Sequence, residues 1–332
     1  MSNAKNQVSA ACECCGVQKS VQISEKRGWK ILQCSHCGLS FVWPQPTSQQ
    51  LTNVYKKSSG YFATSESDLS KTSPDASMYI HNLLLSIGMK PGHLLDVGCS
   101  TGRLIYHLNN IGWQVSGIEI NADAADIARK NNLDVRDGEL EVGQYQKSSF
   151  DVILMGDVIE HVRSPRQFLT LSYDLLREGG LLFINTPNAQ SGFATASLLL
   201  SKLINFPWPH SEAPYHLYEF SPDTLSRLLS SIGYEICCLR YKGSNTFFYT
   251  IGATGFFDDL KASMKQAGRY KFNLKFLGNI PSLALISCIL LPFYLFGKIY
   301  DKLSHSGSKF HVIARKVSRP ANSNGINTGK TI

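Results

Sequence analysis

The sequence lacks the features that mark fibrous, repetitive and disordered proteins. Its 26 glycines and 13 prolines are close to average usage in 332 residues, and no repeat or heptad run appears. This excludes a collagen-like or low-complexity chain. Charged residues are few, at 17%, against 43% apolar residues. A chain of this length and composition can bury a sizeable core and divide into one large domain with smaller attachments.

The N-terminus also lacks an apolar run. A secretory signal peptide would need one, so the sequence favours a cytoplasmic protein. The net charge of +8 comes from the C-terminal quarter, because residues 256–332 hold 12 of the 33 Lys and Arg but only three of the 25 Asp and Glu. The positive charge therefore belongs to the tail and not to the whole surface.

Composition divides the chain into five segments. The predicted division is a Cys-rich head at 1–45, a Ser-rich linker at 46–74, an α/β core at 75–243, an apolar and basic insert at 244–308, and a final strand with a disordered tail at 309–332.

Five of the nine cysteines fall within residues 12–37, which in a chain without a secretory signal favours metal binding over disulfides. They include two Cys-x-x-Cys pairs that are eighteen residues apart. Four thiolates at this spacing close a tetrahedral Zn²⁺ site and leave no open position, so we predict a structural zinc ribbon. Cys14 is an alternative ligand, and reduced free thiols are the alternative to metal. The predicted ligands are Cys12, Cys15, Cys34 and Cys37.

The core alternates short apolar runs with helical patterns. Strands are expected at 94–98, 113–120, 133–136, 150–156 and 180–185, and helices at 101–111, 121–131 and 164–177. This alternation predicts a mostly parallel sheet with right-handed crossovers. Ligands bind at the carboxyl ends of the strands in such a sheet, so functional residues are expected there.

A glycine loop follows the first expected strand of the core, which contains Asp96. Gly98 and Gly102 allow unusual backbone dihedrals, and the next helix presents free N–H groups to an anionic or polar ligand. The dinucleotide fingerprint is not met, because the glycines are four residues apart and Ser100 lies between them. Glu119 ends the second expected strand, where a carboxylate can accept both hydroxyls of a ribose. These residues predict a nucleotide cofactor.

Together these motifs resemble those of class I S-adenosylmethionine-dependent methyltransferases. The likeness covers residues 75–243 and 309–317, and it implies a Rossmann-like α/β sheet of seven strands. The small zinc ribbon would precede this sheet, and the apolar insert would precede its last strand. The matching segments are 96–102 with Glu119, 137–140, 150–151, 157–161, 216–222 and 310–316.

The resemblance also implies the cofactor contacts. Asp96 and the loop 98–102 would hold the methionine part of S-adenosylmethionine, Glu119 the ribose, residues 138–140 the adenine, and Asp157 would line the methionine end. The alternative is that Asp96 and Glu119 cap turns in a sheet that binds another nucleotide. The expected contacts are Asp96, Gly98, Cys99, Gly102, Glu119, Ile120, Gly138, Glu139, Leu140 and Asp157.

Methyl transfer from a sulfonium requires an aligned nucleophile, and a hydroxyl nucleophile must also lose a proton. Histidine is the base suited to neutral pH. His216 ranks first, because it lies before the helix expected from residue 221 and follows a Pro-, Trp- and Tyr-rich insert. His161 ranks second, because in similar methyltransferases the Glu-His pair also holds the cofactor pocket. Tyr215 and Glu160 rank behind them.

Residues 276–297 contain no charged side chain and are long enough to span a bilayer. Pro281 and Pro292 interrupt this run, and the strand expected at 310–316 must return to the sheet. We therefore expect the run to lie in a membrane interface, flanked by basic residues. A second apolar stretch, 196–204, follows the fifth expected strand and is a candidate to cover the acceptor pocket. Ordinary core or a dimer interface is the alternative for both stretches.

The combined pattern predicts O-methylation of a glycan, lipid-linked or other small-molecule acceptor at the cytoplasmic membrane face, as the resemblance to bacterial sugar and quinone methyltransferases implies. Carbon methylation is not expected, because no third α/β domain follows the core. An RNA methyltransferase is one alternative, but the Asn-Pro-Pro-aromatic box of base N-methylation is absent, so no nucleic-acid partner is expected. A non-catalytic S-adenosylmethionine-binding protein is the other alternative.

Overall fold

The computed structural model describes residues 7–8, 10–47, 49–51, 68–204, 207–242, 295–296, 298–303 and 305–318. Most of the predicted insert, and all of its apolar run except residues 295–296, lies outside the described residues. Much of the predicted linker lies outside them as well. Among the helices that the structure describes, none is both long enough and apolar enough to cross a membrane.

The larger of two sheets has seven strands in the order β11-β12-β9-β8-β5-β6-β7. The strands from β9 to β7 are parallel, and β12 is antiparallel to both neighbours. This mixed sheet confirms the predicted fold class. The strand order reverses between β5 and β8, and such folds bind ligands at the carboxyl ends of the strands at this point. The strands are β5 (His93–Val97), β6 (Gln114–Glu119), β7 (Asp134–Asp137), β8 (Phe150–Gly156), β9 (Leu176–Pro187), β11 (Tyr234–Lys242) and β12 (Lys309–Lys316).

Helices cover both faces of this sheet, so its central strands bury apolar residues on both faces. Leu95 of β5 and Ile153 of β8 belong to the core on the face of α5 and α7. Their neighbours Leu94 and Val152 belong to the core on the face of α2, α3 and α4. α6 follows β9. The helices are α2 (Asp75–Ser86), α3 (Arg103–Asn110), α4 (Ala122–Lys130), α5 (Pro165–Leu175), α6 (Gly192–Ile204) and α7 (Pro222–Ile232).

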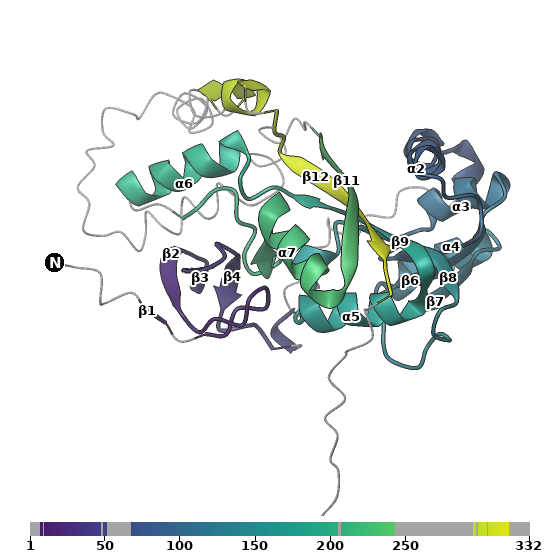
Figure 1. Ribbon diagram of the computed structural model, residues 1–332, viewed down its shortest axis with the longest axis horizontal. Coiled ribbons are helices and arrows are strands. Elements are labelled where there is room, and N and C mark those ends of the chain that lie inside the picture. The colour runs from purple at the N-terminus through teal and green to yellow at the C-terminus, as the bar shows by residue number, and fades with distance from the viewer. Residues whose placement is uncertain are drawn as a thin grey trace, which may run out of the picture.

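The smaller sheet joins the Cys-rich head to the core. Its five strands have the order β1-β2-β3-β4-β10, and β10 pairs antiparallel with β4 so that Tyr218 lies opposite Phe41. Figure 1 shows β2, β3 and β4 near α7, at the other end of the molecule from α2, α3 and α4. The strands are β1 (Gln7–Val8), β2 (Ser20–Lys26), β3 (Trp29–Cys34), β4 (Ser40–Trp43) and β10 (Tyr218–Glu219).

The head and the core also share one apolar cluster. Leu32 and Phe41 of the head belong to the same buried cluster as Leu225 and Leu228 of α7. On α5, Arg166 donates hydrogen bonds of 3.0 and 2.7 Å to two backbone carbonyls of the head. The head is therefore packed against the sheet domain along α5 and α7.

Candidate functional site

Two acidic side chains lie at the carboxyl ends of adjacent strands. Asp96 is the fourth residue of β5, and Glu119 is the last residue of β6. Glu119 is buried, and its two carboxylate oxygens accept hydrogen bonds of 2.8 Å from the backbone N–H groups of Ser100 and Asn121. The carboxylate thus joins the end of β6 to the glycine loop, and both are positioned beside the switch point of the sheet.

The glycine loop needs glycine at both predicted positions. Gly98 has φ +75°, and a Cβ on it would lie 2.6 Å from Cγ2 of Val158. Gly102 has φ +80°, and a Cβ there would lie 2.5 Å from Cδ1 of Leu133. Both the backbone conformation and the close packing exclude larger residues. The side chain of Cys99 is buried near Gly117, and its backbone N–H donates a hydrogen bond of 3.2 Å to the carbonyl of Ile118.

The electrostatics of this end favour a cationic ligand. Asp96 is 5% exposed, and burial together with the nearby charge of Glu119 raises the pKa of its carboxyl to about 8. A cation bound here would relieve the repulsion between the two carboxylates. S-adenosylmethionine carries a cationic sulfonium and an ammonium group, so the charge of the site fits the cofactor that the resemblance implies.

An apolar surface lies next to Glu119. Ile120 directly follows the buried strand β6, yet 57% of its surface is exposed. Further along the chain, Leu140 is buried and the residue before it, Glu139, is exposed. The N–H of Gly138 donates a hydrogen bond of 2.8 Å to the backbone carbonyl of Glu119, which holds residues 138–140 at the end of β6. An exposed isoleucine beside the carboxylate that is predicted to bind the ribose suits the flat, apolar face of an adenine.

Asp157 follows β8 and has a positive φ of 54°. Its carboxylate oxygens lie 2.8 and 2.9 Å from Nζ of Lys309 on β12, and Nδ2 of Asn185 donates a further hydrogen bond of 3.3 Å. Lys309 and Asn185 were not predicted as site residues. The ion pair joins the methionine end of the predicted cofactor site to the last strand of the sheet.

The two candidate bases lie together. His161 ends the short helix η2 (Ile159–His161), and its ring centroid is 4.8 Å from that of His216 in an edge-to-face arrangement. Burial lowers the pKa of His216 to about 3 and also lowers the pKa of His161. Nδ1 of His161 lies 2.8 Å from the backbone carbonyl of Tyr215. Both imidazoles are therefore neutral at pH 7.

Carboxylates surround the histidine pair. Glu160 is fully buried, accepts a hydrogen bond of 2.9 Å from Oγ1 of Thr186, and has a pKa raised above its usual range by burial and by Asp157. Because this raised pKa lies closer to neutral pH than that of an ordinary carboxyl, Glu160 stays a candidate base. Oε2 of Glu212 lies 3.7 Å from Nε2 of His216, and the side chain of Glu212 is 21% exposed. Glu212 therefore lies between the histidine pair and solvent.

The four predicted zinc ligands come together in the head. Their Sγ atoms all lie within 4.8 Å of one another, with Cys12 3.4 Å from Cys37 and Cys15 3.5 Å from Cys34. Zinc–sulfur bonds of about 2.3 Å place tetrahedral sulfurs roughly 3.8 Å apart, so the cluster fits Zn²⁺. The Sγ of Cys14 instead contacts the backbone carbonyl of Thr224 at 3.4 Å, which favours Cys15 as the ligand.

Two equivalent turns shape the cysteine cluster. The N–H of Gly16 donates to the carbonyl of Cys12 at 2.7 Å, and the N–H of Gly38 donates to that of Cys34 at 3.0 Å. Both glycines have positive φ, of 74° and 82°. The Cys-x-x-Cys-Gly repeat therefore forms two matching turns whose thiols converge.

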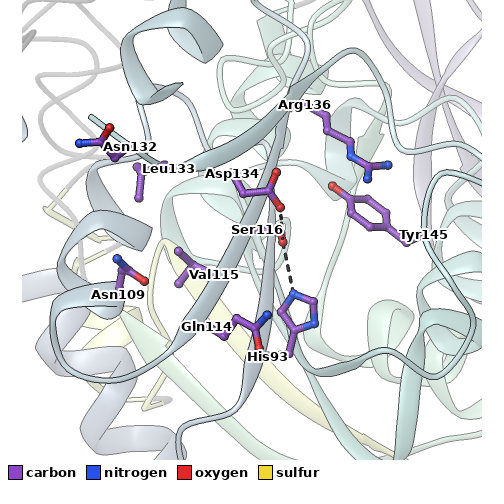
Figure 2. A pocket seen from close by; sticks show the side chains of 10 residues that line it. All are labelled: His93, Asn109, Gln114, Val115, Ser116, Asn132, Leu133, Asp134, Arg136 and Tyr145. Atoms are coloured by element: carbon purple, nitrogen blue, oxygen red, sulfur yellow. Dashed lines mark hydrogen bonds between the residues drawn. The ribbon is translucent and has the colours of Figure 1, made fainter. Parts of the chain in front are cut away.

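A cavity of about 430 Å³ lies at the opposite end of the strands from the candidate site, near the amino ends of β5, β6 and β7. Figure 2 shows Ser116 between His93 and Asp134, with hydrogen-bond distances of 3.2 and 2.8 Å. Because parallel sheets bind their ligands at the carboxyl ends, we assign this cavity no part in the site. A second cavity, of about 410 Å³, lies between the head and the core and is lined by Trp43, Arg163 and Tyr218 among others.

Comparison with known proteins agrees with this geometry. Residues 75–239 match the family model described as a methyltransferase domain. A protein of Glaesserella parasuis named "Ubiquinone biosynthesis O-methyltransferase" is 35% identical over 106 residues, which are 29% of this chain and 45% of that protein. A protein of the same name from Ruegeria pomeroyi is 28% identical over 148 residues, 43% of this chain and 59% of its own length. The chain thus spans about half the length of these curated relatives.

Solved structures are similar at lower identity. A SAM-dependent methyltransferase from Archaeoglobus fulgidus has a TM-score of 0.45 at 16% identity, covering 74% of this chain and 96% of its own. A putative methyltransferase from Bacillus halodurans has a TM-score of 0.48 at 15% identity, covering 76% and 100%. The parallel strands, the glycine loop and the acidic end of β6 all fall inside the matched residues, and through residues 75–239 the chain belongs to the methyltransferase domain family.

Proposed function

We propose that the chain is an S-adenosylmethionine-dependent methyltransferase that transfers a methyl group to a hydroxyl of a small-molecule acceptor. The observation that carries this proposal is the edge-to-face pair of His161 and His216, whose rings meet just beyond the carboxyl end of β8, at the same end of the sheet as the glycine loop. The O-methyltransferase names of the relatives support oxygen as the acceptor atom.

The cofactor would be held by the residues that the resemblance implies. Asp96 and the glycine loop would bind its methionine part, Glu119 would accept the ribose hydroxyls, and Ile120 with residues 138–140 would border the adenine. When bound, the cofactor supplies a methyl group on a cationic sulfur. Glu119 keeps unused lone pairs for this role, because each carboxylate oxygen accepts one backbone N–H and can accept a second donor.

The histidine pair would remove the proton of the acceptor hydroxyl. In His161 the contact with the Tyr215 carbonyl places the proton on Nδ1, so the basic lone pair is on Nε2. A positioned base contributes roughly 10²- to 10⁴-fold to such a reaction. Because burial makes a charged imidazole costly, the proton would pass on, and Glu212 beside His216 is the carboxylate placed to receive it.

We also propose that the four clustered cysteines hold a structural zinc ion. Four thiolates fill the coordination sphere, so this ion would stabilise the head and take no direct part in methyl transfer.

A membrane-linked acceptor is the finer form of the proposal. Two helical segments, α6 and the described residues within 295–303, expose large apolar side chains. The second segment also contains Lys298 and Lys302, and this combination suits a bilayer surface. The N–H of Gly192 on α6 donates a hydrogen bond of 2.7 Å to Asp301, which joins the two helical segments. The cytoplasmic location stays a prediction. The exposed apolar side chains are Leu199, Leu203, Leu295, Phe296, Ile299 and Leu303.

The test supplies radiolabelled S-adenosylmethionine with three substrate pools: a membrane lipid extract, an aqueous small-molecule extract and total RNA. We expect label in one of the first two pools, as an alkali-stable ether, and a loss of at least 100-fold with His216→Gln combined with His161→Gln. His81→Gln on α2 is the matched control and should keep the activity. Label in RNA alone would favour the RNA methyltransferase, and cofactor binding without any transfer would favour the non-catalytic alternative.

A further inference from the structure

The segment 207–221, which carries His216, is held by the head of the chain as well as by the core. Its Trp208 N–H donates a hydrogen bond of 2.9 Å to Oγ of Ser24 on β2. At the end of β2, Nζ of Lys26 donates a hydrogen bond of 2.6 Å to the carbonyl of Ser211. The β2–β3 hairpin therefore contacts this segment at two points upstream of His216.

The residue after His216 forms a bridge between the core and the head. The N–H of Leu217 donates a hydrogen bond of 2.8 Å to the carbonyl of Glu160, next to His161. On its other side the carbonyl of Leu217 accepts a hydrogen bond of 2.9 Å from the N–H of Val42 on β4. The β4–β10 pairing follows directly. A displacement of β4 would therefore move the backbone that orients both histidines.

Burial reinforces these contacts. Ile31 and Val42 of the head share a buried cluster with Trp208 and Ala213 of the segment. Lys26 is only 3% exposed, although lysine is almost never fully buried unless it is paired. Removing an ammonium group from water is costly unless hydrogen bonds compensate for the lost hydration. The hydrogen bond from Lys26 to the carbonyl of Ser211 is therefore a specific contact between the hairpin and the segment.

We propose that the head is a positioning element of the acceptor site, and that Lys26 is the positioning residue that fixes segment 207–221 and thereby the orientation of His216 against His161. The inference rests on the proposed function, because it assigns the acceptor end of the site to the histidine pair. A zinc ribbon would then serve methyl transfer by rigidity, without contacting the reacting atoms. Methyl transfer is sensitive to such alignment, since a misplacement of about 1 Å can cost roughly 100-fold in rate.

The test compares the full-length, zinc-loaded protein with Lys26→Met and with the matched control Lys30→Met, which alters an exposed lysine of the same hairpin. Hydrogen exchange is followed by mass spectrometry in peptides that cover 211–219 and 94–120. We expect Lys26→Met to accelerate exchange in 211–219 by at least tenfold, roughly 1.4 kcal/mol, and to leave 94–120 unchanged. The affinity for S-adenosylhomocysteine should stay within about twofold.

A second readout separates positioning from general stability. The imidazole resonances of His216 should titrate only at strongly acidic pH in the wild-type protein and in Lys30→Met. In Lys26→Met the midpoint should move up toward the ordinary histidine value of about 6.5, because the segment becomes solvated. If Lys26→Met does not fold, Ser24→Ala, which removes the Trp208 contact, is measured in its place.

Unchanged exchange in 211–219 with an unchanged His216 titration would overturn the inference. Equal acceleration in both peptides would overturn it too, because Lys26 would then stabilise the whole fold. Neither readout needs an acceptor or turnover, so a failure of the proposed methyl transfer would be seen separately from a failure of this inference.

Discussion

The cofactor end and the acceptor end of the candidate site are built in different ways. At the cofactor end, Glu119 and the glycine loop lie within residues 96–121 and are joined by local backbone contacts, and residues 138–140 and Asp157 complete this end. The acceptor end combines η2, segment 207–221 and the head, which are far apart in the sequence. The contacts that join Glu119 to the glycine loop thus lie within one contiguous motif, whereas the acceptor end depends on packing between segments that are distant in the sequence.

Loss of the metal should give the largest difference between the two ends, because it should affect the acceptor end and spare the cofactor end. Structural zinc contributes roughly 10–16 kcal/mol in small zinc domains, so Cys37→Ser should abolish metal binding and unfold the head. Exchange in 211–219 should then rise, while the affinity for S-adenosylhomocysteine stays within about twofold. Metal analysis and calorimetry give the two readouts. Cys14→Ser is the control and should keep its zinc, and equal metal loss in both variants would refute the ligand set.

A clash in the glycine loop should weaken the cofactor end. Gly102→Ala adds a Cβ that meets Leu133 at 2.5 Å and also strains a positive φ, so we expect a loss of about 3 kcal/mol in the free energy of unfolding. Gly143→Ala has a positive φ but no atom within 4 Å, so it should cost only about 1 kcal/mol. Urea unfolding measures both, and equal losses would show that the packing of the loop is unimportant.

The raised pKa of Asp96 predicts that cofactor affinity depends on pH. A cationic ligand favours the ionised carboxyl, so binding of S-adenosylmethionine should tighten by about tenfold as pH rises from 6 to 8.5. Without ligand the sign is opposite: the folded-state pKa exceeds the unfolded one, so stability from this group is full below about pH 4 and is lost as pH rises through about 8. Calorimetry at several pH values tests this, and Asp96→Asn should flatten the dependence.

The start of α7 should give the smallest effect, at the acceptor end. Ser221 caps this helix in a reciprocal pair of hydrogen bonds with Thr224, so Ser221→Ala should lower the free energy of unfolding by about 1 kcal/mol. Ser230→Ala, at an exposed position of the same helix, should be close to neutral. Thermal unfolding measures the stability of both variants. Equal changes in the midpoint temperature would show that Ser221 does not cap the helix.

The fold could largely be predicted from the sequence. The expected strand 150–156 matches β8, and the expected helix 121–131 matches α4 to within one residue at each end. The helix start at Ser221 is confirmed by its capping bonds. These elements carry strong local signals, namely apolar runs of strand length and capping residues. β9 begins earlier than expected, because Arg177 and Glu178 give its first residues a polar appearance.

The acceptor end was less predictable. Sequence motifs nominated His161 and His216 separately, but nothing in the spacing shows that their rings meet. β10 has only two residues, so it has no detectable period, and its pairing with β4 arises from the tertiary fold. The burial of Lys26 could not be predicted either, because the sequence of β2 has the pattern of an ordinary amphipathic strand.

S-adenosylmethionine is proposed to bind between the glycine loop and Glu119. Titration of S-adenosylhomocysteine into the wild-type protein, Glu119→Ala and the exposed-site control Glu141→Ala tests it most directly. We predict one binding site in the wild type and in the control, and a loss of affinity of roughly 100-fold or more in Glu119→Ala, because hydrogen bonds to a charged group contribute about 1.5–3 kcal/mol each. Wild-type affinity in Glu119→Ala, or no binding to the wild type, would contradict the claim.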